Sequence, residues 1–399
     1  MQDEAYTLTE KKSHILFISS WWPTAEKSNG TFVELHALGL VSRGCKCTVL
    51  LNSESSLGKH LKEGFNDKRI LEYRRDPKLS FIENSIVHKK PLRFYKEPEN
   101  QRKKSIIRQT LRRLSDYVAA NGKPDFIFHH GVFNYTYLSE AVSEEFNIPI
   151  WYMENSPKIE VDSIPTANPF AGQQDLLDFA KNADRRFAVT KSYVSKMEEV
   201  FNVPFELCPN IITDNFFIEP SDRVNPEGYF QFVNVAILDE RKNQQLLLRS
   251  FAENFKDNQK FRLAIAGDGD LYEDLKRLAN DLGIEQQVKI TGFLNRTELK
   301  ELLDQSHCFV LSSKSETFGV VVIEAMARGI PAISSDIDGT REIINEDNGL
   351  LFEEGDQKSL SIAMNEVIKN YSHYNPAVIV NIVKKNYGPD ASYKALFKQ

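Results

Sequence analysis

The chain alternates short apolar runs with longer segments in which apolar residues recur every three or four positions. The apolar runs predict buried strands, among them 14–19, 46–51, 230–238, 261–266, 288–291 and 308–311. The periodic segments predict amphipathic helices, among them 101–120, 244–255, 272–282 and 296–305. Strands that alternate with helices are typical of open parallel sheets, which bind ligands at the carboxyl ends of their strands. The pattern therefore predicts an α/β protein.

The alternation is interrupted once by a polar stretch, 219–228, that contains two prolines and a glycine. Such a composition is typical of a linker. We therefore expect an N-terminal domain, 1–218, and a second doubly wound domain, 229–375. We also expect a C-terminal helical segment, 376–399, that returns to the N-terminal domain. A length of 399 residues suits two domains of this size.

Composition narrows the class of protein. The formal net charge of −6 argues against a general nucleic-acid binder. Its four cysteines are few and scattered, which suits a reducing compartment. No apolar run is long enough to span a bilayer, and the acidic N-terminus lacks the apolar core of a signal peptide. These features lead us to expect a cytoplasmic protein.

The stretch from Cys308 to Pro331 carries the most chemical information. It predicts a buried strand, a small polar loop at 312–317, and an apolar helix that ends at Gly329. A strand, a short loop and a helix start form an anion site, because free backbone N–H groups point out of the helix. Glu316 lies in this loop, and Glu324 lies inside the helix.

Glu324 is unusual because its neighbours in the sequence are valine, isoleucine, alanine and methionine. A carboxylate in such surroundings is costly unless several donors meet it, and a sugar diol could provide two. The alternative is that Glu316 caps the helix and Glu324 is an ordinary helical residue that reaches solvent. The residues alone leave both interpretations open.

The spacing Glu316-x7-Glu324 is followed by the sequence Ala-Met-Ala-Arg-Gly-Ile-Pro and, further on, by Gly339-x-x-Glu342. Together with the Phe-Gly pair at 318–319, this resembles the signature of the retaining glycosyltransferases of family 4, glycosyl transferases group 1. The resemblance implies a GT-B fold, with two Rossmann-like domains whose parallel sheets face across a cleft. In that family the C-terminal domain binds a sugar nucleotide and the N-terminal domain binds the acceptor.

The resemblance also implies roles for residues of this stretch. Glu324 would hold the ribose of the sugar nucleotide, and Glu316 would contact the transferred sugar. The backbone between them would face the sugar and the phosphates, and the glycine at the end of strand 261–266 would line the same donor site. These further donor-binding positions are Gly267, Thr317, Phe318, Gly319 and Val320.

A cationic pair follows the first strand of the second domain. Lys242-Asn243 matches the Lys-Asn of the family, whereas Ile237 stands where the family commonly has Arg. The resemblance implies that Lys242 neutralises the donor diphosphate, and Arg241 is a candidate for the same task. Two solvated cations at a helix start are disfavoured, because a helix start prefers anions.

Two residues of the N-terminal domain fall at strand ends. Gly30 follows a polar loop, and in the family a glycine here lets the backbone approach the diphosphate; it also fits an ordinary turn. His130 matches the second histidine of the family's H-x-H-G, which lies near the sugar, while Phe128 replaces the first. The alternative for His130 is a structural histidine.

The segment 89–113 is basic, with ten Lys or Arg against two Glu. It fits either a core helix with a solvated basic back, or a face that meets anionic lipid or an anionic acceptor. The second option predicts peripheral association with the inner face of a membrane.

The function that the resemblance implies is that of a retaining, hexosyl-type glycosyltransferase of bacterial polysaccharide or glycolipid biosynthesis. The donor would be a nucleotide-diphosphate sugar, UDP-sugar above all, and the acceptor a hydroxyl of a glycan or lipid-linked molecule. We expect no metal site and no bound cofactor, because cations and helix amides are placed to stabilise the leaving phosphate. Two alternatives are a hydrolase or epimerase of sugar nucleotides and a catalytically idle sugar-nucleotide-binding subunit.

Overall fold

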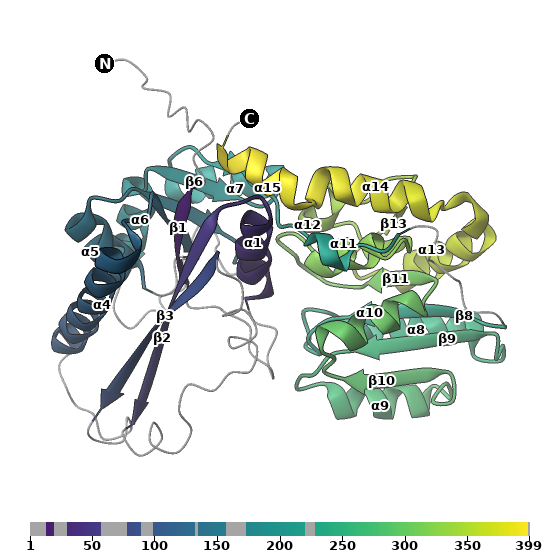
Figure 1. Ribbon diagram of the computed structural model, residues 1–399. Coiled ribbons are helices and arrows are strands. Elements are labelled where there is room, and N and C mark those ends of the chain that lie inside the picture. Colours follow the sequence, from purple (N-terminus) through teal and green to yellow (C-terminus); the bar gives the residue numbers. More distant parts are fainter. Residues whose placement is uncertain are drawn as a thin grey trace. The chain divides into compact units, whose positions relative to one another are not determined.

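The computed structural model describes residues 13–19, 30–56, 78–88, 99–131, 135–156, 173–219 and 228–397 (Figure 1). The chain divides into two compact units. One consists of Met1–Val189, Val194–Pro209 and Ser392–Gln399, and the other of Thr190–Tyr193 and Asn210–Ala391. Each unit contains one sheet whose strands pair in parallel, so the predicted α/β class with two parallel sheets is confirmed.

The first unit is built on a seven-stranded sheet of order β3-β2-β1-β4-β5-β6-β7. The order reverses between β1 and β4, where Ser19 pairs with His130. In an open parallel sheet such a switch point is where ligands bind, at the carboxyl ends of the strands. The strands are β1 His14–Ser19, β2 Lys46–Ser56, β3 Leu79–His88, β4 Phe126–His130, β5 Ile150–Glu154, β6 Arg185–Ala188 and β7 Glu206–Leu207.

The helices of the first unit pack apolar residues onto this sheet and onto one another. The side chains of Ile106 and Leu114 in α4 are fully buried, and α4 packs against α5. These elements are α1 Thr31–Ser42, α4 Glu99–Asn121, α5 Thr136–Phe146, α6 Gln173–Asn182, most of α7 Lys191–Phe201, and the end of α15 Pro389–Phe397.

The second unit is built on a six-stranded sheet of order β10-β9-β8-β11-β12-β13, which reverses between β8 and β11. Its strands are β8 Phe230–Val235, β9 Phe261–Ala266, β10 Val288–Gly292, β11 Cys308–Leu311, β12 Ala332–Ser335 and β13 Gly349–Phe352. Its helices are α8 Gln244–Phe255, α9 Tyr272–Asp281, α10 Arg296–Asp304, α11 Val320–Ala327, α12 Asp338–Arg341, α13 Gln357–Lys369 and α14 Pro376–Tyr387, with short 3-10 turns at Asp214–Phe216 and Tyr371–His373. Helix α13 packs against α8, and α14 packs against α11.

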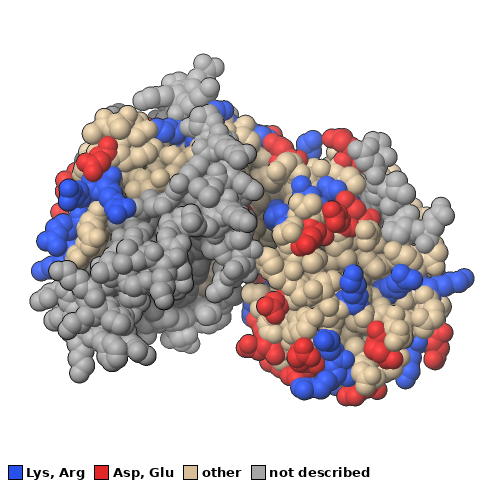
Figure 2. Space-filling model, turned by 60° about the horizontal axis from the view of Figure 1, so that its bottom comes forward, with Lys and Arg blue, Asp and Glu red and all other residues tan. Residues whose placement is uncertain are grey.

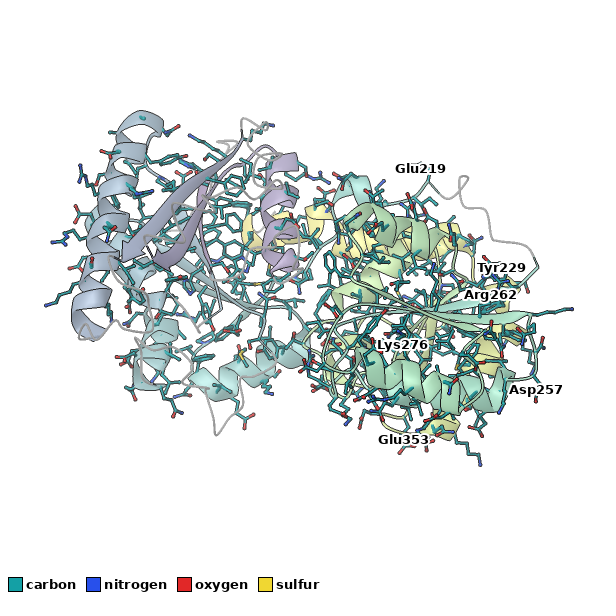
Figure 3. The ribbon with its side chains drawn as sticks, turned by 90° about the horizontal axis from the view of Figure 1, so that it is seen from below. Glu219, Tyr229, Asp257, Arg262, Lys276 and Glu353 are labelled. Carbon is teal, nitrogen blue, oxygen red and sulfur yellow. The ribbon has the colours of Figure 1, made fainter. Side chains whose placement is uncertain are left out.

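The first strand of this sheet is shorter than predicted. It ends at Val235, because the chain then turns toward the end of β9, where the Leu238 N–H donates to the Asp268 carbonyl at 3.0 Å. At the opposite edge, the guanidinium of Arg262 lies 4.1 Å from the ring centroid of Tyr229, which precedes β8 (Figure 3). Tyr229 and Arg262 thus mark the amino edge of the sheet, and the loops that follow β8 and β9 lie at the other, carboxyl edge.

The chain passes from the first unit to the second after Pro209, before the predicted linker, and returns to the first unit at Ser392. Residues 220–227 of that linker lie outside the described residues, while Asn210 to Glu219 group with the second unit. The end of the chain groups with the first unit. There the Arg185 guanidinium donates to the Leu396 carbonyl, and the Phe397 ring lies 6.0 Å from that of Trp151.

Candidate active site

Two loops meet at the switch point of the second sheet, 236–243 after β8 and 312–319 after β11. Neighbouring parallel strands bring them side by side, and two hydrogen bonds join them. The Ser312 hydroxyl donates to the Lys242 carbonyl at 3.0 Å, and the Lys314 N–H donates to the Arg241 carbonyl at 2.8 Å. Residues about seventy positions apart in the sequence thus form one site.

Lys242 and Glu316 form an ion pair between these loops, with side chains that are only 10% and 11% exposed. The Ser313 hydroxyl donates to the same Glu316 oxygen at 2.8 Å, and Arg241 Nη1 lies 3.9 Å from the other oxygen. Arg241 Nη2 also lies 3.8 Å from Asp239 Oδ2, so two cations and two carboxylates gather where the loops meet. The alternative of a solvated cation is therefore wrong for Lys242, whereas the Arg241 side chain is 35% exposed.

Helix α11 begins beside this pair. Its N-cap residue is Gly319, in the left-handed region at φ 95°, and no described side chain caps the helix. Glu316 is therefore not a helix cap, and that alternative is wrong as well. The amides at an uncapped helix start attract negative charge, which favours a phosphate near Thr317 and Val320. Both of those residues are half-buried.

Phe318 contributes to this loop through its backbone. Its side chain is buried, with its ring 5.5 Å from that of Tyr387 in an edge-on contact. Phe318 can therefore make its predicted contact with the donor only through its backbone amide and carbonyl groups.

Two glycines allow the site loops to pack closely. A Cβ on Gly339 would lie 2.4 Å from the Glu316 carbonyl oxygen, and one on Gly267 would lie 1.8 Å from that of Ala236. Real Cβ contacts do not come so close, so both positions require glycine. Gly267 thus supports the loop after β8 by letting its backbone approach, and Gly339 does the same for the loop that carries Glu316.

Glu324 is buried in α11, with 4% of its surface exposed, and does not reach solvent as the alternative required. Its Oε1 accepts a hydrogen bond from Arg296 Nη1, and the two side chains form an ion pair. Arg296 was not among the predicted site residues, and no pattern in the sequence connects the two positions.

The candidate residues of the first unit lie at its own switch point. Gly30 is the N-cap of α1, at φ 87°, where a left-handed conformation favours glycine. His130 is fully buried at the end of β4, and neither ring nitrogen has a hydrogen-bond partner among the described residues. Its ring lies 5.4 Å from His36, which the sequence analysis missed.

These histidines are neutral at pH 7. Burial lowers the pKa of His130 well below 6.5, and the neighbouring His36 and His129 lower it further. Burial likewise lowers the pKa of His36 to about 4, partly offset by a hydrogen bond to the Pro209 carbonyl. His129 has a pKa of about 4 for the same reason, although its ring binds Ser139 and the Gly131 carbonyl. A neutral His130 can donate a hydrogen bond from one ring nitrogen and accept one at the other without carrying charge.

Two Asp-x-Asp sequences follow strands of the second unit and bear on the expectation of a metal-free reaction. Asp336 and Asp338 both form ion pairs with Arg341, and Asp268 accepts a hydrogen bond from the Gly269 N–H. Within the described residues, no three His, Cys, Asp or Glu side chains are grouped as metal ligands.

Comparison with solved structures identifies the class of fold. Sucrose-phosphate synthase from Thermosynechococcus elongatus superposes with a TM-score of 0.72 at 17% identity, covering 97% of this chain and 100% of that one. Anabaena HepE in complex with UDP and glucose gives 0.67 at 16% identity, covering 97% and 98%. Together with the two parallel sheets, these matches confirm the predicted GT-B class.

The sequence of the second unit is similar to a family of known proteins. Residues 216–379 match the model of the glycosyl transferases group 1, which confirms the resemblance seen in the motifs. An uncharacterized glycosyltransferase of Methanocaldococcus jannaschii is 31% identical over 166 residues, 41% of this chain and 42% of the relative. The alpha-monoglucosyldiacylglycerol synthase of Streptococcus pneumoniae is 29% identical over 162 residues, 40% and 35% of the two chains. The match thus spans 42% and 35% of the length of these curated relatives.

Proposed function

We propose that the protein is a retaining glycosyltransferase that moves a hexosyl group from a nucleotide-diphosphate sugar to a hydroxyl group. The observation that carries this proposal is the meeting of Lys242, Glu316 and the uncapped start of α11 at one switch point. This arrangement offers cations and amides for a diphosphate and a held carboxylate for a sugar. The group 1 family match over the same residues supports it.

The charges of the reaction fit these groups. When the nucleoside diphosphate leaves, positive charge develops on the sugar and negative charge on the phosphate. Lys242, Arg241 and the amides after Thr317 stabilise the phosphate, while Glu316 orients the sugar. In a front-face reaction the leaving phosphate helps to deprotonate the acceptor, so that the anomeric configuration is retained. In this proposal Gly30 lets the backbone approach the diphosphate, and His130 orients the sugar.

We further propose a UDP-sugar as donor and a glycan or lipid-linked acceptor. Anabaena HepE, which shares the fold, is described in complex with UDP and with UDP-glucose. Among the relatives are the alpha-monoglucosyldiacylglycerol synthase of S. pneumoniae and an amylovoran biosynthesis glycosyltransferase of Erwinia amylovora, 30% identical over 156 residues. These names support a bacterial polysaccharide or glycolipid as the product.

A membrane surface is the proposed meeting place with a lipid-linked acceptor. Among the helices of the described ranges, none has the length and apolarity that a membrane crossing requires. The solvent-facing side of α4 is basic, and Figure 2 shows Lys and Arg gathered at the left, where α4 lies in Figure 1. Among the described side chains of α4, the exposed cations are Lys104, Arg108, Arg112 and Arg113. In this proposal they bind anionic headgroups at the inner face of the membrane.

The test is a product assay with radiolabelled sugar nucleotides and a panel of glycan and lipid-linked acceptors. A labelled glycoside with the donor's anomeric configuration is the expected product. Free or altered sugar would instead identify a hydrolase or epimerase, and binding without turnover would identify an idle subunit. Repeating the assay after chelation of divalent ions tests the expected independence from metal.

A further inference from the structure

Among the described residues, one side chain, that of Arg296, donates a hydrogen bond to the buried carboxylate of Glu324. Its neighbours Val322, Ile323, Ala325 and Met326 are all fully buried. A carboxylate in such a place is costly unless donors meet it. Oε1 receives the Arg296 guanidinium, whereas no hydrogen bond from the described residues reaches Oε2. One oxygen is therefore left for a donor from elsewhere.

Arg296 is held firmly in this position. It is the first residue of α10, directly after Asn295, which closes a capping box with Glu298. Its guanidinium lies 4.4 Å from the ring centroid of Phe216, a buried residue. With its backbone fixed by the cap and its side chain by the ring, Arg296 can hold Glu324 in one rotamer.

A second ion pair also joins α10 and α11, and its geometry is that of a purely structural ion pair. The guanidinium of Arg328, the C-cap of α11, donates to both oxygens of Asp304 at 2.8 and 2.7 Å. Its remaining nitrogen donates to the Phe216 carbonyl at 2.8 Å. This bidentate pair satisfies both carboxylate oxygens, so it fastens α10 to α11 without any further donor. The Arg296–Glu324 pair repeats the connection but leaves Oε2 unused.

We propose that Arg296 is a positioning residue that holds Glu324 Oε1 so that Oε2 accepts a ribose hydroxyl. The pair thereby makes the site selective for ribonucleotides. This inference rests on the proposed function, in which Glu324 binds the ribose of the donor. A carboxylate only accepts hydrogen bonds, so a deoxyribose loses a donor that nothing replaces. The Arg296 side chain is 32% exposed, compared with 5% for the Glu324 side chain.

The experiment compares UDP, GDP and ADP with their 2′-deoxy and 3′-deoxy counterparts by calorimetry. The wild type is expected to prefer at least one ribonucleotide over a deoxy counterpart by about tenfold or more, the range of a charge-assisted hydrogen bond. In Arg296→Gln, the preference should fall to within about twofold, mainly through weaker binding of the ribonucleotide. Arg277→Gln removes an exposed ion pair and is the matched control; it should keep the full preference.

Two outcomes separate this inference from the proposed function. A wild type that binds none of the nucleoside diphosphates overturns the proposed function itself. A wild type that binds with ribose preference, and an Arg296→Gln variant that keeps the same ratio, overturns only the role of Arg296. If Arg296→Gln does not fold, Arg296→Lys keeps the charge without the planar fork. A reduced ratio in Arg296→Lys supports the positioning role, and an unchanged ratio overturns it.

Discussion

Lys242 and Glu316 form an ion pair between the loops that follow two adjacent strands, β8 and β11. Both side chains are nearly buried, and two hydrogen bonds between the loops fix their backbones. The pair keeps a cation and a carboxylate in place before any substrate binds. Such preorganisation is the usual source of electrostatic stabilisation in catalysis.

If the proposed reaction is correct, Lys242→Ala is expected to lower turnover on the order of a hundredfold, because the leaving phosphate loses the stabilising charge of Lys242. Steady-state kinetics with the identified donor measures this effect. Lys276→Ala removes a half-exposed cation of α9 and serves as control. If Arg241→Ala abolishes turnover while Lys242→Ala does not, the charge that stabilises the phosphate belongs to Arg241 instead.

Gly339→Ala tests the close packing behind Glu316. The added Cβ would meet the Glu316 carbonyl oxygen at 2.4 Å, so the loop must shift. We expect a stability loss of about 1–3 kcal/mol in urea unfolding, together with a fall in turnover. The control is Gly355→Ala, which has a positive φ of 76° but nothing within 4 Å of the added Cβ. It should lose stability and keep turnover; equal turnover in both variants would argue against loop displacement.

The sequence predicted those parts of the fold that depend on local pattern. The strands at 14–19, 261–266 and 308–311 and the helix at 244–255 have the predicted bounds, because apolar runs and helical periodicity define them. Strand β2 extends past its prediction to Ser56, since its last residues are polar and extend only by pairing with β3. The pairing of β2 with β3 joins distant parts of the chain, so a local sequence pattern does not predict it.

The site likewise contains residues that a sequence motif predicts and residues that only tertiary packing brings in. Glu316 and Lys242 were predicted because the motif places them, although only the parallel pairing of β8 and β11 brings them into contact. The partner of Glu324 was missed, because Arg296 precedes it by 28 residues and pairs with it only through the packing of α10 beside α11. His36 was missed for a similar reason, since a histidine inside an apolar helix carries no local signal.

His130→Phe distinguishes a catalytic histidine from a structural one. The ring stacks 5.8 Å from Phe17 and contacts Phe128 edge-on, so phenylalanine keeps these contacts and removes only the nitrogens. Because those nitrogens lack partners among the described residues, we expect unfolding stability to be unchanged or higher. Transfer should nevertheless fall while nucleotide binding is kept. Normal transfer by a stable variant would show that His130 is structural.

The buried histidines predict a loss of stability in acid. The pKa of His36 is lowered from 6.5 to about 4, so the unfolded chain binds a proton below pH 6.5 that the folded protein does not. This contribution to stability is complete above pH 6.5 and is lost as the pH falls toward about 4. A shift of this size corresponds to roughly 3 kcal/mol. Urea unfolding between pH 7.5 and 4.5 measures it.

Protonation of ion-paired carboxylates also destabilises the folded protein in acid. The control is therefore a comparison of how steeply the stability of different variants falls with pH. His36→Gln keeps a donor for the Pro209 carbonyl and removes the titration, so the curve of stability against pH should become less steep. His373→Gln changes an exposed histidine and should leave the steepness as in the wild type. A His36→Gln curve parallel to the wild type would contradict the assignment.

The last prediction concerns the basic side of α4. Its buried residues Ile106 and Leu114 face the core, so the cations on the other side remain in solvent whether or not a membrane is present. Three of them, Lys104, Arg108 and Arg112, are exposed on successive turns. Each contributes about 1 kcal/mol near an anionic leaflet, and a local excess of this kind contrasts with the acidic chain as a whole.

We therefore expect the protein to sediment with anionic but not with neutral liposomes, and salt to release it through screening. Changing Lys104, Arg108 and Arg112 together to Glu should abolish sedimentation without lowering the melting temperature, because none of the three is buried. The matched control reverses Lys276 and Arg277, exposed cations of α9, and should sediment like the wild type. Equal binding to the two kinds of liposome would indicate an apolar attachment, and no binding at low salt would leave α4 as an ordinary helix of the first unit.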